Sequence, residues 1–291
     1  MKHCAFLTLD QPGDFVIDDE HAVQPLADLG WHVAIVSWRQ TRLAWSDFDA
    51  VIIRSTWDYW NDVEGFLAVL RVIDGATRLA NPLHLVQWNL QKTYLRDMEQ
   101  KGVAIVPTLW SQVLDTSSMA DFYDRLRSEE IVIKPLLGAN GVDAFRLSRT
   151  QGEADYAALI PLFRNRPMLV QRFMPAIITE GEYSLFFFNG EFSHAILKVP
   201  ASGEFRSQEE RGAEIHAIVP EDRLLARGRQ ALAAIDQAPL YARIDFVRDE
   251  HGDFVVMECE LIEPSLYLRM DPLAPARFAR AVDDWFSESS R

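Results

Sequence analysis

Apolar and polar positions alternate in short blocks through the first part of the chain. Apolar runs of strand length cover Cys4 to Leu9, His32 to Trp38 and Ala50 to Ile53. An amphipathic stretch from Asp19 to Leu29 lies between the first two runs and ends at Gly30, a common C-terminal stop of a helix. Strands that alternate with helices predict a parallel sheet, which binds ligands at the carboxyl ends of its strands.

A second unit is predicted to begin near Trp88. The pattern of apolar positions favours helices over Leu90 to Lys101 and Ser118 to Ser128. Three apolar strands are then expected at Ile131 to Lys134, Ala144 to Leu147 and Met168 to Phe173.

From residue 181 onward the pattern is typical of antiparallel hairpins. Tyr183 to Phe188 and Glu191 to Lys198 flank the dipeptide Asn189-Gly190, which is a strong hairpin signal. A second hairpin is expected from Ala242 to Val247 and Phe254 to Glu260, around a polar turn at 250–253. The predicted class is therefore α/β with an α+β C-terminal part.

Three carboxylates stand on the second hairpin. Glu258 and Glu260 are two positions apart on one strand, so both side chains point to the same face, and Asp245 can face them from the neighbouring strand. Acids at this density repel one another unless a cation lies among them. Mg²⁺ prefers carboxylate ligands of this kind and completes its shell with phosphate oxygens. The hairpin therefore predicts a site for a metal–nucleotide complex.

Composition excludes several classes of protein. The net charge of −14 opposes nucleic-acid binding over a broad surface. No apolar run approaches the roughly 18 residues of a membrane span, and the start of the chain lacks the features of a signal peptide. We therefore expect a cytoplasmic protein without a membrane or nucleic-acid partner. The two cysteines, Cys4 and Cys259, are too few and too far apart for a zinc site and are expected to be buried thiols.

Polar side chains follow the third apolar run. Arg54, Ser55 and Asp58 come directly after it, where a parallel sheet binds its ligands. We therefore expect Arg54 to contact a substrate. A polar loop anchored by its aromatic residues is the alternative, and both interpretations stay open for Ser55 and Asp58.

Lys134 closes an apolar strand immediately before a loop that contains Gly138, Asn140 and Gly141. A lysine at this point can place its ammonium on phosphate oxygens. The loop permits positive φ and close approach to a phosphate, but it has neither the GxxxxGK[ST] nor the GxGxxG pattern, and alone it favours a plain hairpin loop. Lys92 lies on a predicted helix and is weaker evidence, since a lysine is usually a solvated charge.

The strand end before Pro175 has the features of an adenine site. Backbone groups at Gln171 and Arg172 can bind the ring edge, and Phe173 and Met174 can cover its faces. Glu182 follows, where its carboxylate can accept from ribose hydroxyls. Candidate ligands of phosphate or carboxylate groups are Lys198, Arg206, Arg211 and Arg243, the last of which is also the strongest candidate for a structural partner of nearby acids.

In sequence order these segments resemble the ATP-grasp superfamily, and within it the ligases similar to glutathione synthetase and RimK. The segments are Asn89 to Lys92, Val132 to Pro135, Gly138 to Gly141, Val170 to Pro175, Gly181-Glu182, Phe205-Arg206, Arg243 to Asp245 and Met257 to Glu260. Two others, Ile53 to Tyr59 and Glu182 to Pro200, look more like the subgroup that includes the D-cycloserine ligase.

The resemblance implies three domains and a nucleotide held between the last two. An N-terminal pre-ATP-grasp domain would span 1–88, a small lid domain 89–170 and a C-terminal domain with the antiparallel sheet and metal site 171–291. Lys92 and Lys134 would hold phosphates, and the glycine loop would close over them. The three carboxylates would hold one or two Mg²⁺ ions, for which Mn²⁺ can substitute. Related ligases often form homodimers or homotetramers, and the oligomeric state of this chain stays open.

The sequence departs from the family pattern at three positions. Glu260 stands where asparagine is common, which adds a charge to the metal site. Gln171 stands near a position that often carries glutamate, and Asn140 replaces a frequent glycine and can stiffen the lid.

The implied reaction joins a carboxylate to an amine through an acylphosphate, with ATP cleaved to ADP. The candidate catalytic residues are Lys134 and Arg206 for phosphoryl transfer, and Arg206 or Arg243 for the tetrahedral oxyanion. Lys198, with the polar residues after the third strand, would bind a small amino-acid-like substrate. Ligation of two molecules and cyclisation of one both remain open. The alternatives are a non-catalytic nucleotide sensor on the same fold, which has no use for a complete metal triplet, and an acidic interaction protein.

Overall fold

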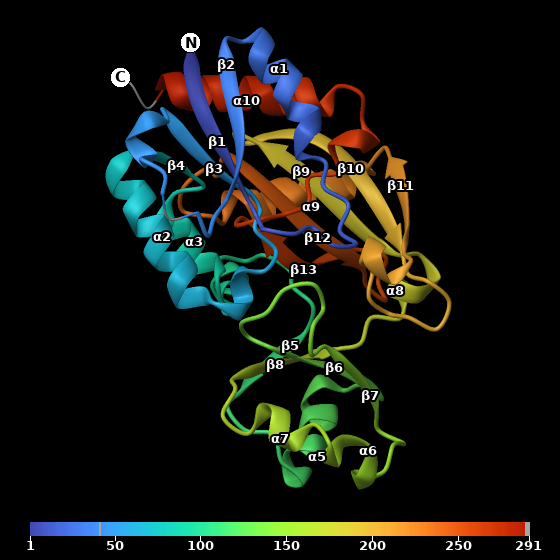
Figure 1. Cartoon of the computed structure of the whole chain (residues 1–291). Helices are drawn as coiled ribbons and strands as arrows, with labels where there is room; N and C mark the ends of the chain where they lie inside the picture. Colours follow the sequence, from blue (N-terminus) through green and yellow to red (C-terminus); the bar gives the residue numbers. More distant parts are fainter. Residues whose placement is uncertain (41, 289–291) are drawn as a thin grey trace.

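The structure is a computed structural model that describes residues 1–40 and 42–288, and it contains three sheets (Figure 1). The N-terminal sheet is parallel, in the order β2-β1-β3-β4. Its strands are β1 (Lys2–Thr8), β2 (Trp31–Ser37), β3 (Ala50–Ser55) and β4 (Arg78–Ala80). Helices cover both faces, because α1 packs on the side of Phe6 and α2 (Val63–Ala76) on the side of Leu7. The expected parallel α/β unit is confirmed.

The helix expected over residues 19–29 folds as two shorter pieces. A 3₁₀ turn, η1 (Asp19–Ala22), precedes α1 (Val23–Asp28). Pro25 accounts for the break, because its nitrogen cannot donate to the carbonyl four residues earlier. An α-helix can therefore contain this proline only in its first turn, which is where α1 has it.

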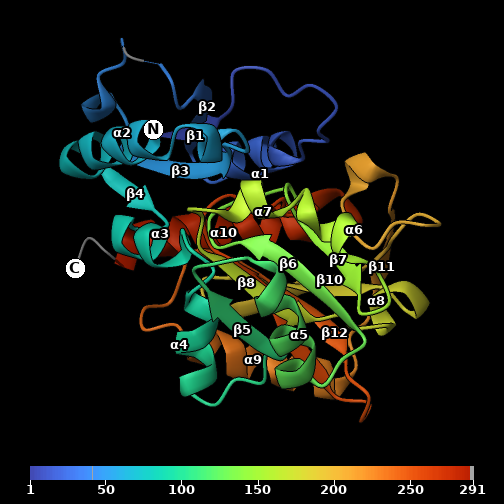
Figure 2. The same ribbon diagram turned by 90° about the horizontal axis from the view of Figure 1, so that it is seen from below.

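The second sheet forms a separate lobe at the lower end of the molecule (Figure 1), which we call the lid. Its strands are antiparallel in the order β5-β8-β6-β7. The strands are β5 (Thr108–Ser111), β6 (Glu130–Pro135), β7 (Phe145–Ser148) and β8 (Met168–Arg172), and the helices are α5 (Thr116–Leu126), α6 (Glu153–Ala157) and α7 (Ile160–Phe163). Seen from the lid end, the lid lies in front of the large sheet and to one side of the N-terminal sheet (Figure 2).

The helix expected from Leu90 to Lys101 is shorter than predicted. After α3 (Leu83–Asn89), α4 covers only Tyr94–Gln100. The backbone N–H of Lys92 donates to Leu136 O of the lid at 2.8 Å. The chain at Lys92 is therefore tied to the lid strand instead of being wound into the helix.

The third sheet is antiparallel, in the order β11-β10-β9-β12-β13. The hairpin turn between β9 and β10 has positive φ at both Asn189 (47°) and Gly190 (85°), as the sequence predicted for this dipeptide. Its strands are β9 (Glu182–Phe188), β10 (Glu191–Val199), β11 (Glu214–Ile218), β12 (Tyr241–Arg248) and β13 (Phe254–Glu260), and the helices of this part are α8 (Ala176–Thr179), α9 (Asp222–Ala233) and α10 (Ala274–Glu288).

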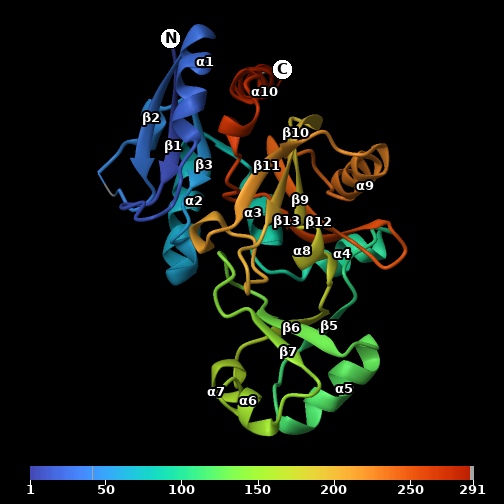
Figure 3. The ribbon, with the colours of Figure 1, turned by 90° about the vertical axis from the view of Figure 1, so that its right-hand side faces the viewer.

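The C-terminal helix joins the N-terminal sheet to the large sheet. Figure 3 shows α10 end-on between the two sheets. Phe278 of α10 lies 6.2 Å from the ring of Phe6 and 5.2 Å from that of Phe188. These rings belong to one buried apolar cluster, so the first and last segments of the chain share a core.

The expected division between lid and C-terminal domain, after residue 170, falls inside β8. This strand pairs with β5 and β6 and continues to Arg172. The domain boundaries themselves stay a prediction. Within the described part of the chain, none of the helices combines the length and the apolar character that a membrane span requires.

His194 on β10 gives the large sheet a predicted sensitivity to acid. The ring is buried, stacks on Phe186 at 4.2 Å and contacts Ser193 Oγ and Leu266 O. Burial lowers the pKa of His194 from 6.5 to about 4. As the pH is lowered, His194 takes up a proton in the unfolded chain before it does so in the folded protein. The free energy of unfolding therefore falls as the pH drops from 6.5 towards 4, by about 2–3 kcal/mol at pH 4.5.

We expect His194→Gln to lose less stability between pH 7 and pH 4.5 than the parent protein, as measured by urea unfolding at both pH values. The exposed residue His251 provides the control, because His251→Gln should leave the acid sensitivity unchanged. An equal acid sensitivity of the His194 variant and the parent would contradict this assignment.

Candidate active site

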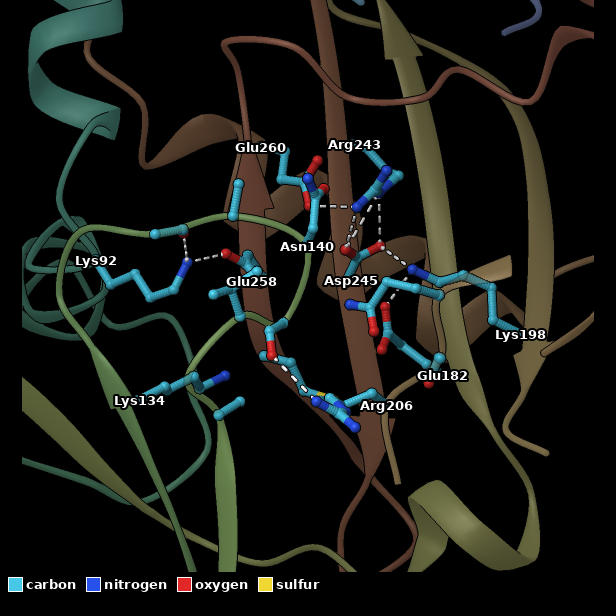
Figure 4. Close-up of a pocket in the computed structure, with 18 of the residues that line it drawn as sticks. Lys92, Lys134, Asn140, Glu182, Lys198, Arg206, Arg243, Asp245, Glu258 and Glu260 are labelled. Atoms are coloured by element: carbon cyan, nitrogen blue, oxygen red, sulfur yellow. Dashed lines mark hydrogen bonds and ion pairs between the residues drawn. The ribbon is translucent and has the colours of Figure 1, made fainter. Parts of the chain in front are cut away.

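One pocket is lined by residues of the lid, by residues of the large sheet and by loop residues of the N-terminal domain. Figure 4 shows β12 and β13 as its floor, with Lys92 and Lys134 on one side and Lys198 and Glu182 on the other. The loop with Asn140 crosses in front of the floor (Figure 4).

The three predicted carboxylates stand on the floor of this pocket. Asp245 of β12 pairs directly with Glu258 of β13, and Glu260 follows two positions along the strand. Asp245 is 2% exposed, whereas the side chains of both glutamates are 28% exposed and reachable from the pocket. Cys259 lies between the glutamates but is buried on the opposite face, as expected from strand alternation.

Each carboxylate has a basic neighbour from this chain. Lys92 forms an ion pair with Glu258, and Arg243 forms ion pairs with both Asp245 and Glu260 (Figure 4). Although burial opposes it, Arg243 together with Lys198 holds the pKa of Asp245 at about 2. Enclosure in the pocket, reinforced by Asp245 and Glu258, instead raises the pKa of Glu260 to about 7.

Within the described residues, no group of three or more His, Cys, Asp or Glu side chains already has the arrangement of a metal site. The ion pairs explain this, because they turn the carboxylates towards basic side chains. The donor set nevertheless fits Mg²⁺, because three carboxylates share one strand pair and two of them, Glu258 and Glu260, are reachable from the pocket.

The two lysines expected at phosphates approach the floor from the lid side. Lys92 Nζ donates to Gly138 O at 3.2 Å and also contacts Glu258. For Lys134, the described part of the chain contains no hydrogen bond or ion pair to its ammonium, and burial lowers its pKa. An ammonium that is desolvated and unpaired in a pocket is suited to an anionic ligand.

The glycine loop touches two other parts of the protein. Asn140 and Gly141 both have positive φ (56° and 61°), a conformation that these residue types tolerate. Asn140 Nδ2 donates to Trp57 O of the N-terminal domain at 3.4 Å. Arg211 donates to Asn140 O at 3.4 Å, and Arg206 to Gly141 O at 3.5 Å. The loop is therefore closed onto the pocket and held from both sides.

The strand end expected to bind adenine is partly occupied by the protein's own contacts. The backbone N–H groups of Arg172 and Phe173 donate to Pro107 O and Glu130 O at 3.0 Å, so neither is available to a ring edge. Gln171 Nε2 donates to Thr108 Oγ1 at 3.1 Å, and the Arg172 guanidinium donates to Leu126 O. The side chains of Phe173 and Met174 are buried and line the pocket, as an apolar slot for a ring requires.

Glu182 and Lys198 form a buried ion pair on the opposite wall. Burial raises the pKa of Glu182, and Lys198 also lies 3.5 Å from Asp245. Burial opposes protonation of Lys198, but Asp245 and Glu182 raise its pKa nonetheless. Lys198 thus helps to neutralise the negative charge of the floor carboxylates. If it also contacts a substrate, it must do so while paired with these acids.

The two arginines expected to act in catalysis have different surroundings. Arg206 forms a bidentate pair with Glu204 at 3.0 and 2.6 Å, which holds the pKa of Glu204 at about 2, and its guanidinium still faces the pocket. Arg243 is almost fully engaged, with Asp245, Glu260 and Ser265 O as acceptors. These contacts support the alternative interpretation of Arg243, in which it is a structural partner of the nearby acids.

The structure places Arg54, Ser55 and Asp58 outside the pocket. Arg54 is 1% exposed and donates to Asp19 Oδ1 (3.0 Å) and Pro264 O (2.9 Å). Ser55 bonds to Thr8, and Asp58 accepts from the indole of Trp38 at 2.7 Å. The expectation of substrate contact is corrected for Arg54, because its guanidinium is used by Asp19 and by the backbone of Pro264. For Ser55 and Asp58, where both interpretations were open, the observed contacts support a packed polar loop.

Sequence reasoning missed a set of pocket residues that follow β13. The side chains of Glu263, Ser265 and Tyr267 line the pocket, together with Trp57 and Tyr59 from the N-terminal domain. The available signal was a further acid, Glu263, immediately after the strand with the proposed metal ligands. For Trp57 and Tyr59, the sequence left contact with a substrate and an anchoring role in a polar loop equally open.

Comparison with known protein families gives two matches along the chain. Residues 4–81 match the family described as "D-cycloserine synthetase DcsG, N-terminal domain". Residues 98–245 match the family described as "Prokaryotic glutathione synthetase, ATP-grasp domain".

Individual relatives agree with these matches. The cycloserine biosynthesis protein DcsG of Streptomyces lavendulae is 30% identical over 271 residues, which cover 87% of this chain and 89% of the relative. The crystal structure of D-cycloserine synthetase DcsG superimposes with a TM-score of 0.85 at 27% identity and covers 98% of this chain and 99% of its own. The ATP-grasp ligase PsnB, solved with a minimal precursor variant, Mg and ADP, shares the fold at 15% identity with a TM-score of 0.65 and coverage of 98% of both chains.

Proposed function

Because the chain belongs to the ATP-grasp superfamily of ADP-forming carbon–nitrogen ligases, in the family of DcsG, we propose that it activates a small amino-acid-like carboxylate as an acylphosphate and transfers it to an amine. One observation carries the proposal. A single pocket joins an acidic floor to Lys134, a desolvated lysine without an ion pair among the described residues, under a closed glycine loop, which is the charge pattern needed for a metal-bound triphosphate.

ATP-grasp ligases use ATP and Mg²⁺, and we assign their contacts to this chain as follows. Phe173 and Met174 would cover the adenine ring, and Glu182 would accept from the ribose. Asp245, Glu258 and Glu260 would hold one or two Mg²⁺ or Mn²⁺ ions, which supply positive charge to the phosphates. Lys134 and Lys92 would bind phosphate oxygens from the lid side, and Gly138, Asn140 and Gly141 would cover them.

Two steps follow from this arrangement. The substrate carboxylate attacks the γ-phosphorus, the bond to the ADP oxygen breaks, and Lys134 and Arg206 neutralise the charge that develops. The amine then attacks the acyl carbon, phosphate leaves with the bonding electrons, and the amine gives up a proton. The closed loop would keep water from the acylphosphate between the steps. Arg206 is better suited than Arg243 to the oxyanion, because Arg243 is occupied by the floor carboxylates.

The similarity to a cycloserine biosynthesis protein and to D-cycloserine synthetase supports cyclisation within one molecule over ligation of two, since cycloserine is a cyclic product. O-amino-serine carries a carboxylate and an aminooxy group that close into that ring, and it is the first substrate to test. A cytoplasmic location and assembly into a homodimer or homotetramer complete the proposal, and light scattering of the purified protein tests the assembly.

Nucleotide binding and turnover test the proposal separately. We expect ADP with Mg²⁺ to raise the melting temperature by about 5 °C or more at saturating ligand, and less so with EDTA. A phosphate-release screen with Mg²⁺-ATP, amino acids and small amines, including O-amino-serine, should then give one product identifiable by mass. A melting shift without phosphate release for any substrate would favour the nucleotide sensor. No shift with any nucleotide would exclude both functions.

A further inference from the structure

Glu263 differs from the other carboxylates of the pocket. It lies directly after β13, in the segment that joins the pocket floor to the C-terminal helix. Of the pocket carboxylates that are not exposed to solvent, it alone has no ion pair within the described residues. The paired ones are Glu182 and Asp245 with Lys198, Glu258 with Lys92, Glu260 with Arg243, and Glu209 with Arg269.

The backbone around Glu263 is held by two donors from the N-terminal domain. Trp57 Nε1 donates to Glu263 O at 2.7 Å, and Arg54 Nη2 donates to the neighbouring Pro264 O at 2.9 Å. Burial, together with the charge of Glu263, raises the pKa of the Tyr59 hydroxyl, so this ring lies close to the Glu263 side chain. The two hydrogen bonds fix the backbone from which the Glu263 side chain reaches the pocket.

Aromatic rings stand on the same side of the pocket. Trp57, Tyr59 and Phe15 all line it, and the rings of Phe15 and Trp57 are 5.0 Å apart in an edge-to-face arrangement. Aromatic faces attract ammonium groups and exclude water around them, which strengthens the attraction of an ammonium to a carboxylate. The combination is selective for organic cations.

Burial and the neighbouring acids disfavour the ionised form of Glu263. Enclosure and the nearby Glu260 raise the pKa of Glu263 to about 8, although Lys92 and Arg243 oppose the rise and Glu258 adds to it. A cationic ligand is therefore the missing partner on this wall of the pocket.

We propose that Glu263, between Trp57 and Tyr59, is the subsite for the ammonium group of the substrate. The inference rests on the proposed ligase function and adds the substrate class: a small zwitterion whose carboxylate is directed to Lys134 and Arg206 while its ammonium lies on Glu263. An analogue without the amino group loses this contact, so the enzyme should discriminate against it.

The test uses two probes that differ only in the α-amino group, O-amino-serine and 3-(aminooxy)propanoic acid. Both keep the carboxylate and the aminooxy nucleophile. For the parent protein we expect kcat/KM for the first probe to exceed that for the second on the order of 30-fold, as for a hydrogen bond to a charged group. Glu263→Gln should reduce this ratio to about 3-fold or less, mainly through KM for O-amino-serine.

Glu99→Gln is the matched control, because Glu99 is exposed on α4 and the same charge is removed far from the pocket wall. It should preserve the discrimination. A merely structural Glu263 would make the substitution lower activity on both probes alike, and that result, or an unchanged ratio, overturns the subsite.

Failure of the ligase function gives a different result. In that case the parent protein releases no ADP from Mg²⁺-ATP with O-amino-serine. Calorimetric titration of both probes into the Mg²⁺-ADP complex then tests the subsite without turnover. Preferential binding of O-amino-serine that is lost in Glu263→Gln supports it, and equal or absent binding of the two probes to the parent protein overturns it.

Discussion

Glu258→Gln is expected to abolish the Mg²⁺ dependence of nucleotide binding and to lower kcat/KM on the order of 10³-fold, which corresponds to about 4 kcal/mol of transition-state stabilisation. The substitution keeps the size of the side chain but removes a charge that stands opposite Asp245 on the pocket floor. With one ligand charge missing, the remaining carboxylates should hold a divalent ion poorly.

Two measurements check the effect of this substitution. Phosphate release as a function of Mg²⁺ concentration reports catalysis, and the melting shift produced by ADP with Mg²⁺ or EDTA reports binding. Glu191→Gln is the control, since Glu191 is exposed at the start of β10 and should keep both the rate and the Mg²⁺ dependence. A Glu258→Gln variant that retains the Mg²⁺-dependent shift and loses less than about tenfold in rate would contradict the metal assignment.

The same substitution bears on Lys92. In the absence of a metal, Glu258 and Lys92 form an ion pair, and Glu258 raises the pKa of Lys92 against the opposing effect of burial. A cation that takes over Glu258 would free the lysine for a phosphate oxygen. Metal binding to Glu258 would release Lys92 for the nucleotide, and nucleotide binding to Lys92 would release Glu258 for the metal. The two ligands would therefore bind cooperatively.

Local patterns of the sequence sufficed for the hairpins. Asn189-Gly190 fixes its own turn through backbone conformation, and the spacing of Glu258 and Glu260 fixes their common face through strand alternation. The placement of these residues depends on their neighbours in the sequence, so it can be predicted without knowledge of the fold. The α/β class of the N-terminal part follows from periodicity in the same way.

Contacts between segments that are distant in the sequence could not be predicted from local patterns. Arg54 follows a buried strand, which made it a candidate for substrate binding, but its partners are Asp19 and the backbone of Pro264, 210 positions away. No periodicity encodes that pair. Glu263 was overlooked for the related reason that its significance lies in having no ion pair within the described residues, and a missing partner can be recognised only when the whole pocket is assembled.

The shortened helix near Lys92 has a comparable cause. Its apolar spacing favours a helix from Leu90, but the backbone of Lys92 is used by a hydrogen bond to Leu136 in the lid. Tertiary hydrogen bonding thus overrides local propensity at the point where the lid is attached.

Arg243→Met is expected to be the most destabilising single change in the site, costing about 3–5 kcal/mol of unfolding free energy. Arg243 Nε donates to both oxygens of Asp245 at 3.1 and 3.2 Å, and its Nη2 donates to Asp245 and Glu260. Without it, Asp245 stays buried at 2% exposure with only Ser184 and the more distant Lys198, at 3.5 Å, as partners. Leaving a buried charge without its main partner costs more free energy than the intact ion pair contributed to stability.

Urea unfolding followed by tryptophan fluorescence measures this cost, and a double variant identifies its source. If the unpaired carboxylate is responsible, Asp245→Asn added to Arg243→Met should recover part of the lost stability, so the two changes will not be additive. Arg280→Met, on the exposed side of α10, should change stability by less than about 0.5 kcal/mol. Additive losses in the double variant would mean that Arg243 acts through packing, and its guanidinium would then be free to serve the reaction.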